Sequence, residues 1–249
     1  GQVHKARLLD GEEVILKVVK PGHRELLKRD TILLNLLGRF LQTFLGRLQP
    51  RKVLKEFSDY TLRELDLTRE SDNAETFAAN FRDMPNVVFP KIFREFSGRD
   101  VLCMEFLDGF KPTSAAGDEL SDEDRAKLLD LGASSIIRML YRDGFFHADL
   151  HPGNLMILPG PQLGFIDLGM VGRFTEELKR TLMYYYYCLV MGDSENAARY
   201  LSMVAQPGRM GDVVGFRREV EEICRRWATS SNTKEYPLAH LILRSVAQG

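Results

Sequence analysis

The chain has 249 residues, of which 44% are apolar and 28% are charged, and its 34 Lys and Arg against 35 Asp and Glu leave a formal charge of −1. This composition is typical of a globular chain that buries a sizeable core, so a disordered protein is not expected. Near-neutral charge provides no overall attraction to nucleic acid, and we predict no nucleic-acid partner. Three cysteines without CxxC spacing indicate neither a disulfide framework nor a cysteine zinc site, which favours a reducing compartment, cytoplasmic or organellar.

Hydropathy and the first residues give two further expectations. No run approaches the roughly 18 consecutive apolar residues that span a bilayer, so the chain is expected to be soluble. Its first residue is Gly1, and the next seven, Gln2 to Leu8, already have the pattern of a strand. We therefore expect the chain to begin inside a domain.

The first predicted elements are a hairpin followed by helices. Strands are expected over Val3–Leu9 and Val14–Val19, joined by a turn at Asp10-Gly11. Apolar residues then recur at helical spacing from Arg24 to about Arg82, which predicts two or three helices.

β-branched residues return after these helices and predict a second group of strands. The expected strands cover Val87–Phe89, Lys91–Phe96 and Val101–Phe106, with a turn at residues 97–100. Together with the hairpin they would form a small sheet interrupted by helices.

The second half of the chain is predicted to be mostly helical. Ser121 and Asp124 have the spacing of a capping box that opens a helix reaching Arg142, and Gly144 ends it. Two short strands follow, over residues 155–158 and 163–166, and helices resume after Gly172.

One stretch carries most of the chemical information: residues 147–154, His-Ala-Asp-Leu-His-Pro-Gly-Asn, followed by Asp167-Leu168-Gly169. Kinase catalytic loops place an Asp that positions or deprotonates the acceptor hydroxyl five residues before an Asn that holds a metal ion, as Asp149 and Asn154 are placed. A second metal-binding Asp normally follows a short hairpin, which is the position of Asp167. Because hard oxygen ligands suit Mg²⁺, Asn154 and Asp167 are the predicted metal ligands and Asp149 the predicted catalytic residue.

A phosphate-binding lysine and its carboxylate partner should accompany this loop. Lys17 lies among β-branched residues in a predicted strand, where an unpaired lysine would be costly, and resembles the Val-Ala-Ile-Lys strand of kinases. Its partner should lie on the following helices, and we choose Glu70 over Glu56, Glu64 and Asp66.

The last predicted strand of the first half would end where a hinge binds adenine. Backbone groups at Glu105 and Leu107 are the hydrogen-bonding candidates, next to Met104. The predicted cofactor-binding residues are therefore Lys17, Met104, Glu105, Leu107, Asn154 and Asp167.

These motifs, taken in order, resemble the ABC1/UbiB (AarF/ADCK) family of atypical kinases. The resemblance extends over essentially the whole chain and rests on five motifs: Gly1–Ala6, Leu16–Val18 with Pro21-Gly22, Glu64-Leu65-Asp66 leading to Glu70, His147–Asn154, and Asp167–Gly172.

The resemblance implies an α+β, protein-kinase-like fold with two lobes. The N-terminal lobe would cover residues 1–107 and the mostly helical C-terminal lobe residues 108–249. It also implies ATP and Mg²⁺ as cofactors, and a role in ubiquinone or other isoprenoid-quinone and lipid metabolism at membranes. A quinone-precursor lipid or a membrane surface would then be a partner through flanking segments, making the full-length protein peripheral to a membrane; no oligomeric state is implied.

The chain departs from the family's pattern in informative ways. The family's Glu-x-Asp element, corresponding to Glu64 and Asp66, contacts an N-terminal Lys-x-Gly-Gln extension that precedes the region of resemblance. An Ala-rich phosphate loop is expected just before Gly1, so only its tail is included. No Arg precedes Asp149 and no Ala-Pro-Glu follows Asp167, so weak or absent peptide phosphorylation is expected.

Three alternatives remain open from the sequence. The first is a small-molecule phosphotransferase of the aminoglycoside or choline kinase type, which shares the catalytic loop. The second is an ATPase or nucleotide-gated lipid-binding module that transfers no phosphoryl group. The third concerns His147 and His151, which have a zinc-like spacing of four, but Pro152 breaks any helix there and a structural role is favoured.

Overall fold

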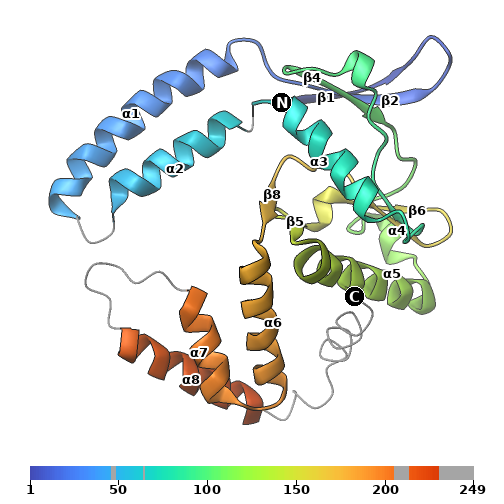
Figure 1. Cartoon of the computed structure of the whole chain (residues 1–249). Coiled ribbons are helices and arrows are strands. Elements are labelled where there is room, and N and C mark those ends of the chain that lie inside the picture. Colours follow the sequence, from blue (N-terminus) through green and yellow to red (C-terminus); the bar gives the residue numbers. More distant parts are fainter. Residues whose placement is uncertain (46–48, 64, 205–212, 230–249) are drawn as a thin grey trace. The chain divides into compact units, whose positions relative to one another are not determined.

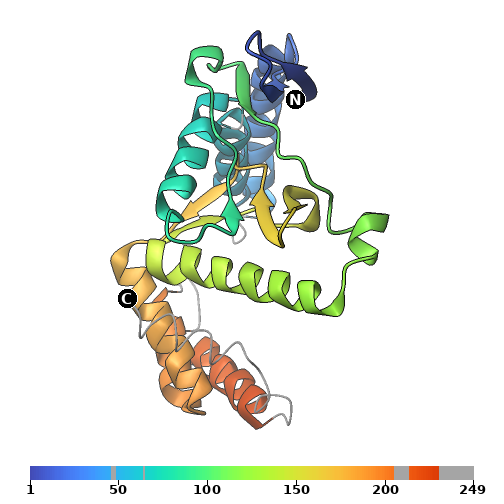
Figure 2. The ribbon, with the colours of Figure 1, turned by 90° about the vertical axis from the view of Figure 1, so that its right-hand side faces the viewer.

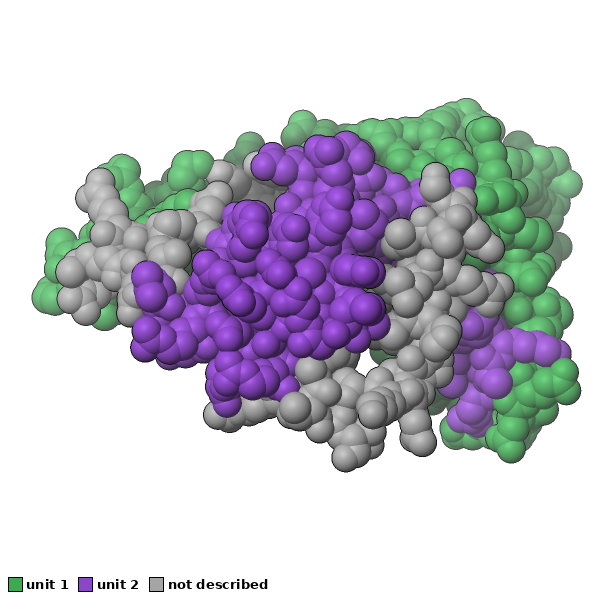
Figure 3. Space-filling view, turned by 60° about the horizontal axis from the view of Figure 1, so that its bottom comes forward, with its two compact units in different colours: residues 1–124, 149–170 green, residues 125–148, 171–249 purple. Residues whose placement is uncertain are grey.

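The computed structural model describes residues 1–45, 49–63, 65–204 and 213–229 (Figure 1). The chain divides into two compact units, coloured separately in Figure 3. Unit 1 contains residues 1–124 and 149–170, and unit 2 contains residues 125–148 and 171–249. These units follow the density of contacts, so the predicted division into lobes at residues 107 and 108 stays a prediction.

Unit 1 begins with a three-stranded antiparallel sheet in the order β1-β2-β4. The predicted hairpin is confirmed as β1 (Gln2–Arg7) and β2 (Glu13–Val18), and β4 (Val101–Glu105) pairs with β2 on its other side. Because side chains alternate along a strand, β2 has two different faces. Val14 and Leu16 pack against Phe93, whereas Ile15 lies on the face of Lys17 and packs against Leu67 and Met104.

Three helices follow β2, as predicted. Helices α1 (His23–Phe44) and α2 (Pro50–Arg63) lie side by side (Figure 1), and α3 (Leu67–Asn80) packs against β4. Asp66 caps α3, since its side chain accepts a hydrogen bond from the Thr68 N–H at 3.3 Å. The buried residues Leu67, Glu70, Ala74 and Phe77 recur at helical spacing on α3, so one face of this helix points into the unit.

The strand predicted over Lys91–Phe96 is wrong. Only Ile92 forms a bridge, to Met104, and Arg94–Phe96 form a 3₁₀ turn, η2. The reason is the hydroxyl of Ser97, which donates to the carbonyl of Phe93 at 2.7 Å and accepts from the Cys103 N–H at 2.9 Å. The Ser97 hydroxyl therefore bonds to the backbone groups of Phe93 and Cys103 that would otherwise pair with each other in a β-ladder.

A second three-stranded sheet of unit 1 leads to the metal-binding motif. Strand β7 (Gln162–Phe165) pairs antiparallel with β6 (Leu155–Leu158) and parallel with β3 (Val87–Val88), so β3 does not join β4 as predicted. The Phe89 ring stacks between Phe77 of α3 and Phe165 of β7, with ring centroids 5.2 and 5.3 Å apart. This aromatic column joins α3 to the strand that ends just before Asp167.

Unit 2 is mostly helical. Helix α5 (Asp122–Ile137), whose first three residues belong to unit 1, continues as a π-helical segment, η3 (Arg138–Asp143), which Gly144 ends with φ of 59°. Strands β5 (Phe145–His147) and β8 (Val171–Arg173) then pair antiparallel. Helices α6 (Glu176–Val190), α7 (Ser194–Val204) and α8 (Val213–Thr229) pack on one another around an apolar cluster that includes Cys188, Ala197 and Val220 (Figures 1 and 2).

Two further short elements are the four-residue helix α4 (Ala115–Asp118) and the 3₁₀ turn η4 (Pro152–Asn154). Across the described ranges, none of the helices combines the length and the apolar character needed to cross a bilayer.

Candidate active site

A lysine and a glutamate form the centre of the candidate site in unit 1. The Lys17 Nζ of β2 donates to both carboxylate oxygens of Glu70 on α3, at 2.8 and 2.7 Å. The Glu70 side chain is only 5% exposed and that of Lys17 19% exposed. Two ionised groups this deeply placed require each other, because a buried charge without a partner is strongly unfavourable.

The electrostatic surroundings keep the lysine charged. Burial alone would lower the pKa of Lys17, but the carboxylates of Glu70 and Asp167 outweigh it and raise that pKa above its usual value of 10.5. For Glu70, burial raises the pKa, and the neighbouring Lys17 ammonium counteracts this. Lys17 therefore carries a positive charge throughout the physiological pH range.

Asp167 lies within reach of the same ammonium. Its Oδ1 is 3.1 Å from Lys17 Nζ and 3.4 Å from the Gly169 backbone nitrogen, in the turn that follows β7. The Asp167 side chain is 48% exposed, unlike that of Glu70. The next residue, Leu168, is 1% exposed, so an apolar side chain anchors the turn while the Asp167 carboxylate lines the cavity.

Asn154 ends the turn η4 on the neighbouring segment. Its amide nitrogen donates to the carbonyl oxygen of Asp149 at 3.0 Å, and its own backbone carbonyl oxygen accepts from the Ile166 N–H at 3.0 Å. Because the amide nitrogen points at Asp149, the amide oxygen is the atom presented to a cation. The residue is buried, at 7% exposure, so its orientation is well defined.

These oxygen donors fit Mg²⁺. Magnesium in nucleotide sites is held by one or two side-chain oxygens, together with phosphate oxygens and water. Asn154 and Asp167 supply such a set. No group of three or more His, Cys, Asp and Glu residues suited to a metal occurs in the part of the chain that the structure describes, so an all-protein metal cage is not found there.

Asp149 lies at the start of this loop with an exposed carboxylate. Its Oδ2 is 3.9 Å from Nε2 of His151, and both side chains are about half exposed, at 54% and 53%. The His151 Nδ1 accepts a hydrogen bond from the Gly153 N–H at 3.0 Å. His151 therefore stabilises the backbone of its own loop, which agrees with the structural role favoured for this histidine.

A cavity of about 330 Å³ lies beside Lys17, Asn154 and Asp167. This volume is within the range of small-ligand sites. Apolar side chains, among them Ile15 and Met156, line it, whereas the predicted catalytic residues Glu70 and Asp149 are not among its lining residues. Of the predicted cofactor-binding residues, its lining contains Lys17, Met104, Glu105, Leu107, Asn154 and Asp167.

The hinge candidates have different backbone roles. The Glu105 N–H donates to the Lys91 carbonyl at 2.8 Å, and the Phe106 N–H donates to the Glu13 carbonyl at 3.2 Å. The Glu105 N–H is thus already used within the fold. The groups left for the predicted contacts with adenine are the Glu105 carbonyl and the backbone of Leu107.

The competing carboxylates lie elsewhere. Glu56 on α2 has a side chain that is 68% exposed, and Asp66 is the cap of α3. Glu64 falls outside the described residues, so Asp66 is the acidic residue of the Glu-x-Asp element that the structure places.

Two residues next to the site were missed by the sequence reasoning. The Asn73 amide donates to the Leu168 carbonyl at 2.8 Å, which joins α3 to the metal-binding turn. Asn73 follows Glu70 by three residues, so helical spacing alone could have suggested it. The Lys111 ammonium donates to the Gly153 carbonyl beside Asn154, and no sequence pattern pointed to it.

Comparison with known proteins agrees with this architecture. The model of the ABC1 atypical kinase-like domain matches residues 1–201. Protein ACTIVITY OF BC1 COMPLEX KINASE 8, chloroplastic, of Arabidopsis thaliana is 32% identical over 225 residues, which cover 88% of this chain and 29% of that protein. The probable protein kinase UbiB of Klebsiella pneumoniae is 34% identical over 190 residues, which cover 73% of this chain and 35% of that protein.

A solved structure is also similar. The Mycobacterium tuberculosis protein Rv3197, solved in complex with erythromycin, superposes with a TM-score of 0.64 and 27% identity, covering 92% of this chain and 57% of that one. The chain spans roughly a third of the length of the curated relatives it matches. The protein belongs to the ABC1 atypical kinase-like family and has its α+β, kinase-like fold.

Proposed function

We propose that this domain binds ATP with Mg²⁺ and catalyses phosphoryl transfer or ATP hydrolysis. The observation that supports the proposal best is the contact of Lys17 with both Glu70 and Asp167 at the wall of the 330 Å³ cavity. A paired lysine next to a metal-binding carboxylate is the arrangement that phosphoryl transfer requires, because catalysis there depends on positioning and on neutralising phosphate charge.

Each residue then has a distinct task. Lys17 binds phosphate oxygens, and Glu70 holds the lysine in place. Asn154 and Asp167 would hold Mg²⁺, which neutralises charge on the phosphates. An acceptor oxygen, from a hydroxyl or from water, attacks the γ-phosphorus as the bond to the β-phosphate oxygen breaks and ADP leaves. Asp149 orients the acceptor and takes its proton.

The adenine ring would occupy the apolar part of the cavity. Ile15 and Val3 belong to the first sheet and Met156 to the second, and all three line the same space. The Glu105 carbonyl and the Leu107 backbone are the groups available for hydrogen bonds to the ring edge. This placement predicts selectivity for a purine base over a bare polyphosphate.

The cellular role is inferred from the sequence resemblance. The family's features favour support of isoprenoid-quinone or other lipid metabolism, with a prenyl lipid or a membrane surface as partner of the full-length protein. A small-molecule phosphotransferase and a nucleotide-gated lipid-binding module remain the alternatives.

Calorimetric titration with ATP at several Mg²⁺ concentrations tests the site. We expect binding that requires Mg²⁺, and Asp167→Asn should raise the Mg²⁺ requirement by about tenfold or more, since even changes to residues that only support metal ligands have effects of that size. Asp30→Asn, an exposed carboxylate on α1, is the control and should leave binding unchanged. Nucleotide binding whose Mg²⁺ dependence is the same in Asp167→Asn would contradict the assignment.

A second measurement separates the alternatives. The full-length protein is incubated with ATP and Mg²⁺, with and without quinone-precursor lipids, and both ADP and phosphorylated products are followed. A phosphorylated acceptor identifies a transferase, whereas ADP and phosphate without such a product identify an ATPase.

A further inference from the structure

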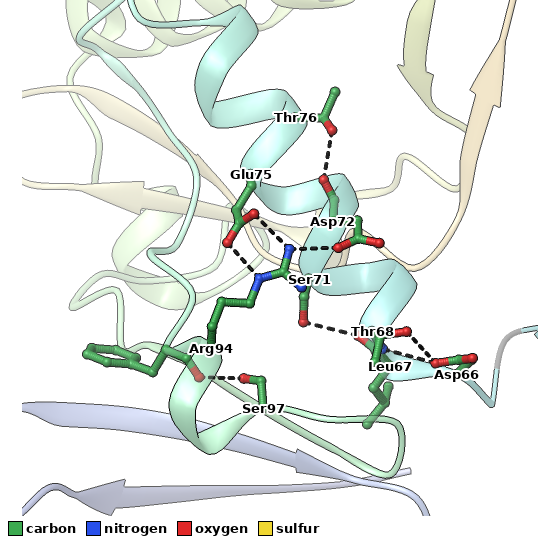
Figure 4. Close-up of polar contacts among 10 residues, drawn as sticks. Asp66, Leu67, Thr68, Ser71, Asp72, Glu75, Thr76, Arg94 and Ser97 are labelled. Atoms are coloured by element: carbon green, nitrogen blue, oxygen red, sulfur yellow. Dashed lines mark hydrogen bonds and ion pairs between the residues drawn. The ribbon is translucent and has the colours of Figure 1, made fainter.

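An arginine outside the cavity connects α3 to the rest of unit 1. Figure 4 shows Arg94 with its guanidinium group between two acidic side chains of α3. Its Nε and Nη2 donate to the two carboxylate oxygens of Glu75 at 2.8 and 2.7 Å, and Nη2 also donates to Asp72 at 2.7 Å. Two parallel bonds from one guanidinium to one carboxylate fix direction as well as distance.

The two ends of this contact belong to different structural elements. Asp72 and Glu75 lie on the exposed face of α3, while Glu70 and Asn73 lie on its buried side. Arg94 belongs to η2, and the Ser97 hydroxyl bonds η2 to Phe93 and Cys103. Cys103 is in β4, which pairs with β2, the strand of Lys17. Arg94 therefore ties the helix of Glu70 to the sheet of Lys17 from outside the site.

Arg94 and Glu75 are 44% and 50% exposed, so their contact depends on its two-pronged geometry rather than on burial. The hydrogen bond from Arg94 lowers the pKa of Glu75 below its usual value of 4.5. A separate polar attachment of α3 lies at its N-terminus, where the Leu67 N–H donates to the Arg99 carbonyl at 3.1 Å and Asp66 lies 3.7 Å from Arg99. Arg94 acts one to two turns further along, so the two attachments lie on either side of Glu70 in the helix.

We propose that Arg94 is a positioning residue that holds α3 in the orientation in which Glu70 reaches Lys17. Its role in catalysis rests on the proposed function, because it works through the Lys17–Glu70 pair. Its role in placing the helix is independent of the proposed function. When the clamp formed by Arg94, Asp72 and Glu75 is removed, α3 shifts or frays more often, and a smaller fraction of molecules has Lys17 ready for phosphate.

Hydrogen exchange of the backbone amides tests the placement without any activity. We expect Arg94→Ala to speed exchange across residues 67–80 by about three- to tenfold, the range that a well-oriented charged network supports. Arg94→Lys keeps the charge but lacks the two-pronged geometry and should give an intermediate rate. The matched control is Arg225→Ala on α8, because Arg225 also contacts two glutamates, at 2.8 Å each, and is 56% exposed.

Nucleotide binding tests the consequence for the site. Arg94→Ala should weaken MgATP binding by about three- to tenfold, and the effect should disappear in a Glu70→Gln background, because both changes act on one pair. A double variant, Asp72→Asn with Glu75→Gln, removes the clamp from the helix side and should reproduce both results.

The outcomes separate the two proposals. Unchanged exchange of α3 in Arg94→Ala and in the double variant overturns the positioning role, and so does faster exchange with unaltered MgATP affinity. A wild-type chain that binds no MgATP refutes the proposed function instead, while the exchange measurement still decides whether Arg94 places the helix.

Discussion

Replacing Glu70 with Gln removes one charge from the Lys17–Glu70 pair and almost no volume. Removing one partner of a fully buried ion pair costs about 3–5 kcal/mol, because the other charge is left uncompensated. Lys17 is 19% exposed and keeps Asp167 at 3.1 Å, so the loss should be smaller. Hydrogen bonds to charged groups contribute about 1.5–3 kcal/mol, and we expect Glu70→Gln to lower the free energy of unfolding by about 2–3 kcal/mol.

Urea unfolding measures this loss. With a slope of about 2 kcal/mol per molar urea, the midpoint should fall by about 1–1.5 M. Glu56→Gln is the control, because Glu56 is 68% exposed and 4.0 Å from Lys52, and its midpoint should change by less than about 0.3 M. The Glu70→Gln variant should also bind MgATP more weakly. Asp167 is then the remaining carboxylate partner of Lys17, and the lysine competes with the metal ion for it. Equal midpoints for Glu70→Gln and Glu56→Gln would refute the reasoning.

Three further changes have expected outcomes. Asn73→Ala removes the bond to the Leu168 carbonyl, should lower stability by about 1–2 kcal/mol and should raise the Mg²⁺ concentration needed for nucleotide binding; a titration identical to wild type would contradict this. In Gly109→Ala the added Cβ overlaps the Ile157 carbonyl, so a loss of about 1–3 kcal/mol is expected in urea unfolding, whereas Gly98→Ala meets open space and should behave as wild type. Hydrogen bonds from Thr68 and Arg94 lower the pKa values of Asp66 and Glu75, so their contribution to stability is present above the unfolded values of 3.8 and 4.5 and is lost as pH falls through the lower folded values. Amide exchange in α3, corrected for the intrinsic pH dependence of exchange, should therefore speed below about pH 4, and a corrected rate that stays constant down to pH 3 would argue against it.

Local patterns account for the part of the fold that could be predicted. The β1–β2 hairpin and the helices after it depend on alternation, helical spacing and turn residues, which act over a few positions. The spacing between Asn154 and Asp167 works in the same way, since a hairpin of set length brings both residues to the cavity wall. Such local signals can be recognised in a sequence without its structure.

Interactions between distant residues account for the part that could not be predicted. A contact of shorter range was also missed: Ser97 bonds to Cys103, six residues further on, and strand propensity does not record this bond. Helical spacing from Glu70 could have suggested Asn73, but its partner Leu168 is 95 residues away, so no local pattern predicts the bond between them. Glu70 is an intermediate case: it shares a helical face with Leu67, Ala74 and Phe77, and this periodicity favours it over the exposed Glu56.

The two bonds of Lys17 also determine when the site can form. Its partners lie 53 and 150 residues further along the chain, and unit 1 is interrupted by residues 125–148. Closing such long loops is slow compared with forming a hairpin or a helix. During synthesis, Lys17 can meet Glu70 once α3 is available, but its contact with Asp167 must wait until Asp167 has left the ribosome. A fragment that ends before β6 would contain the lysine and the glutamate but could not complete the site.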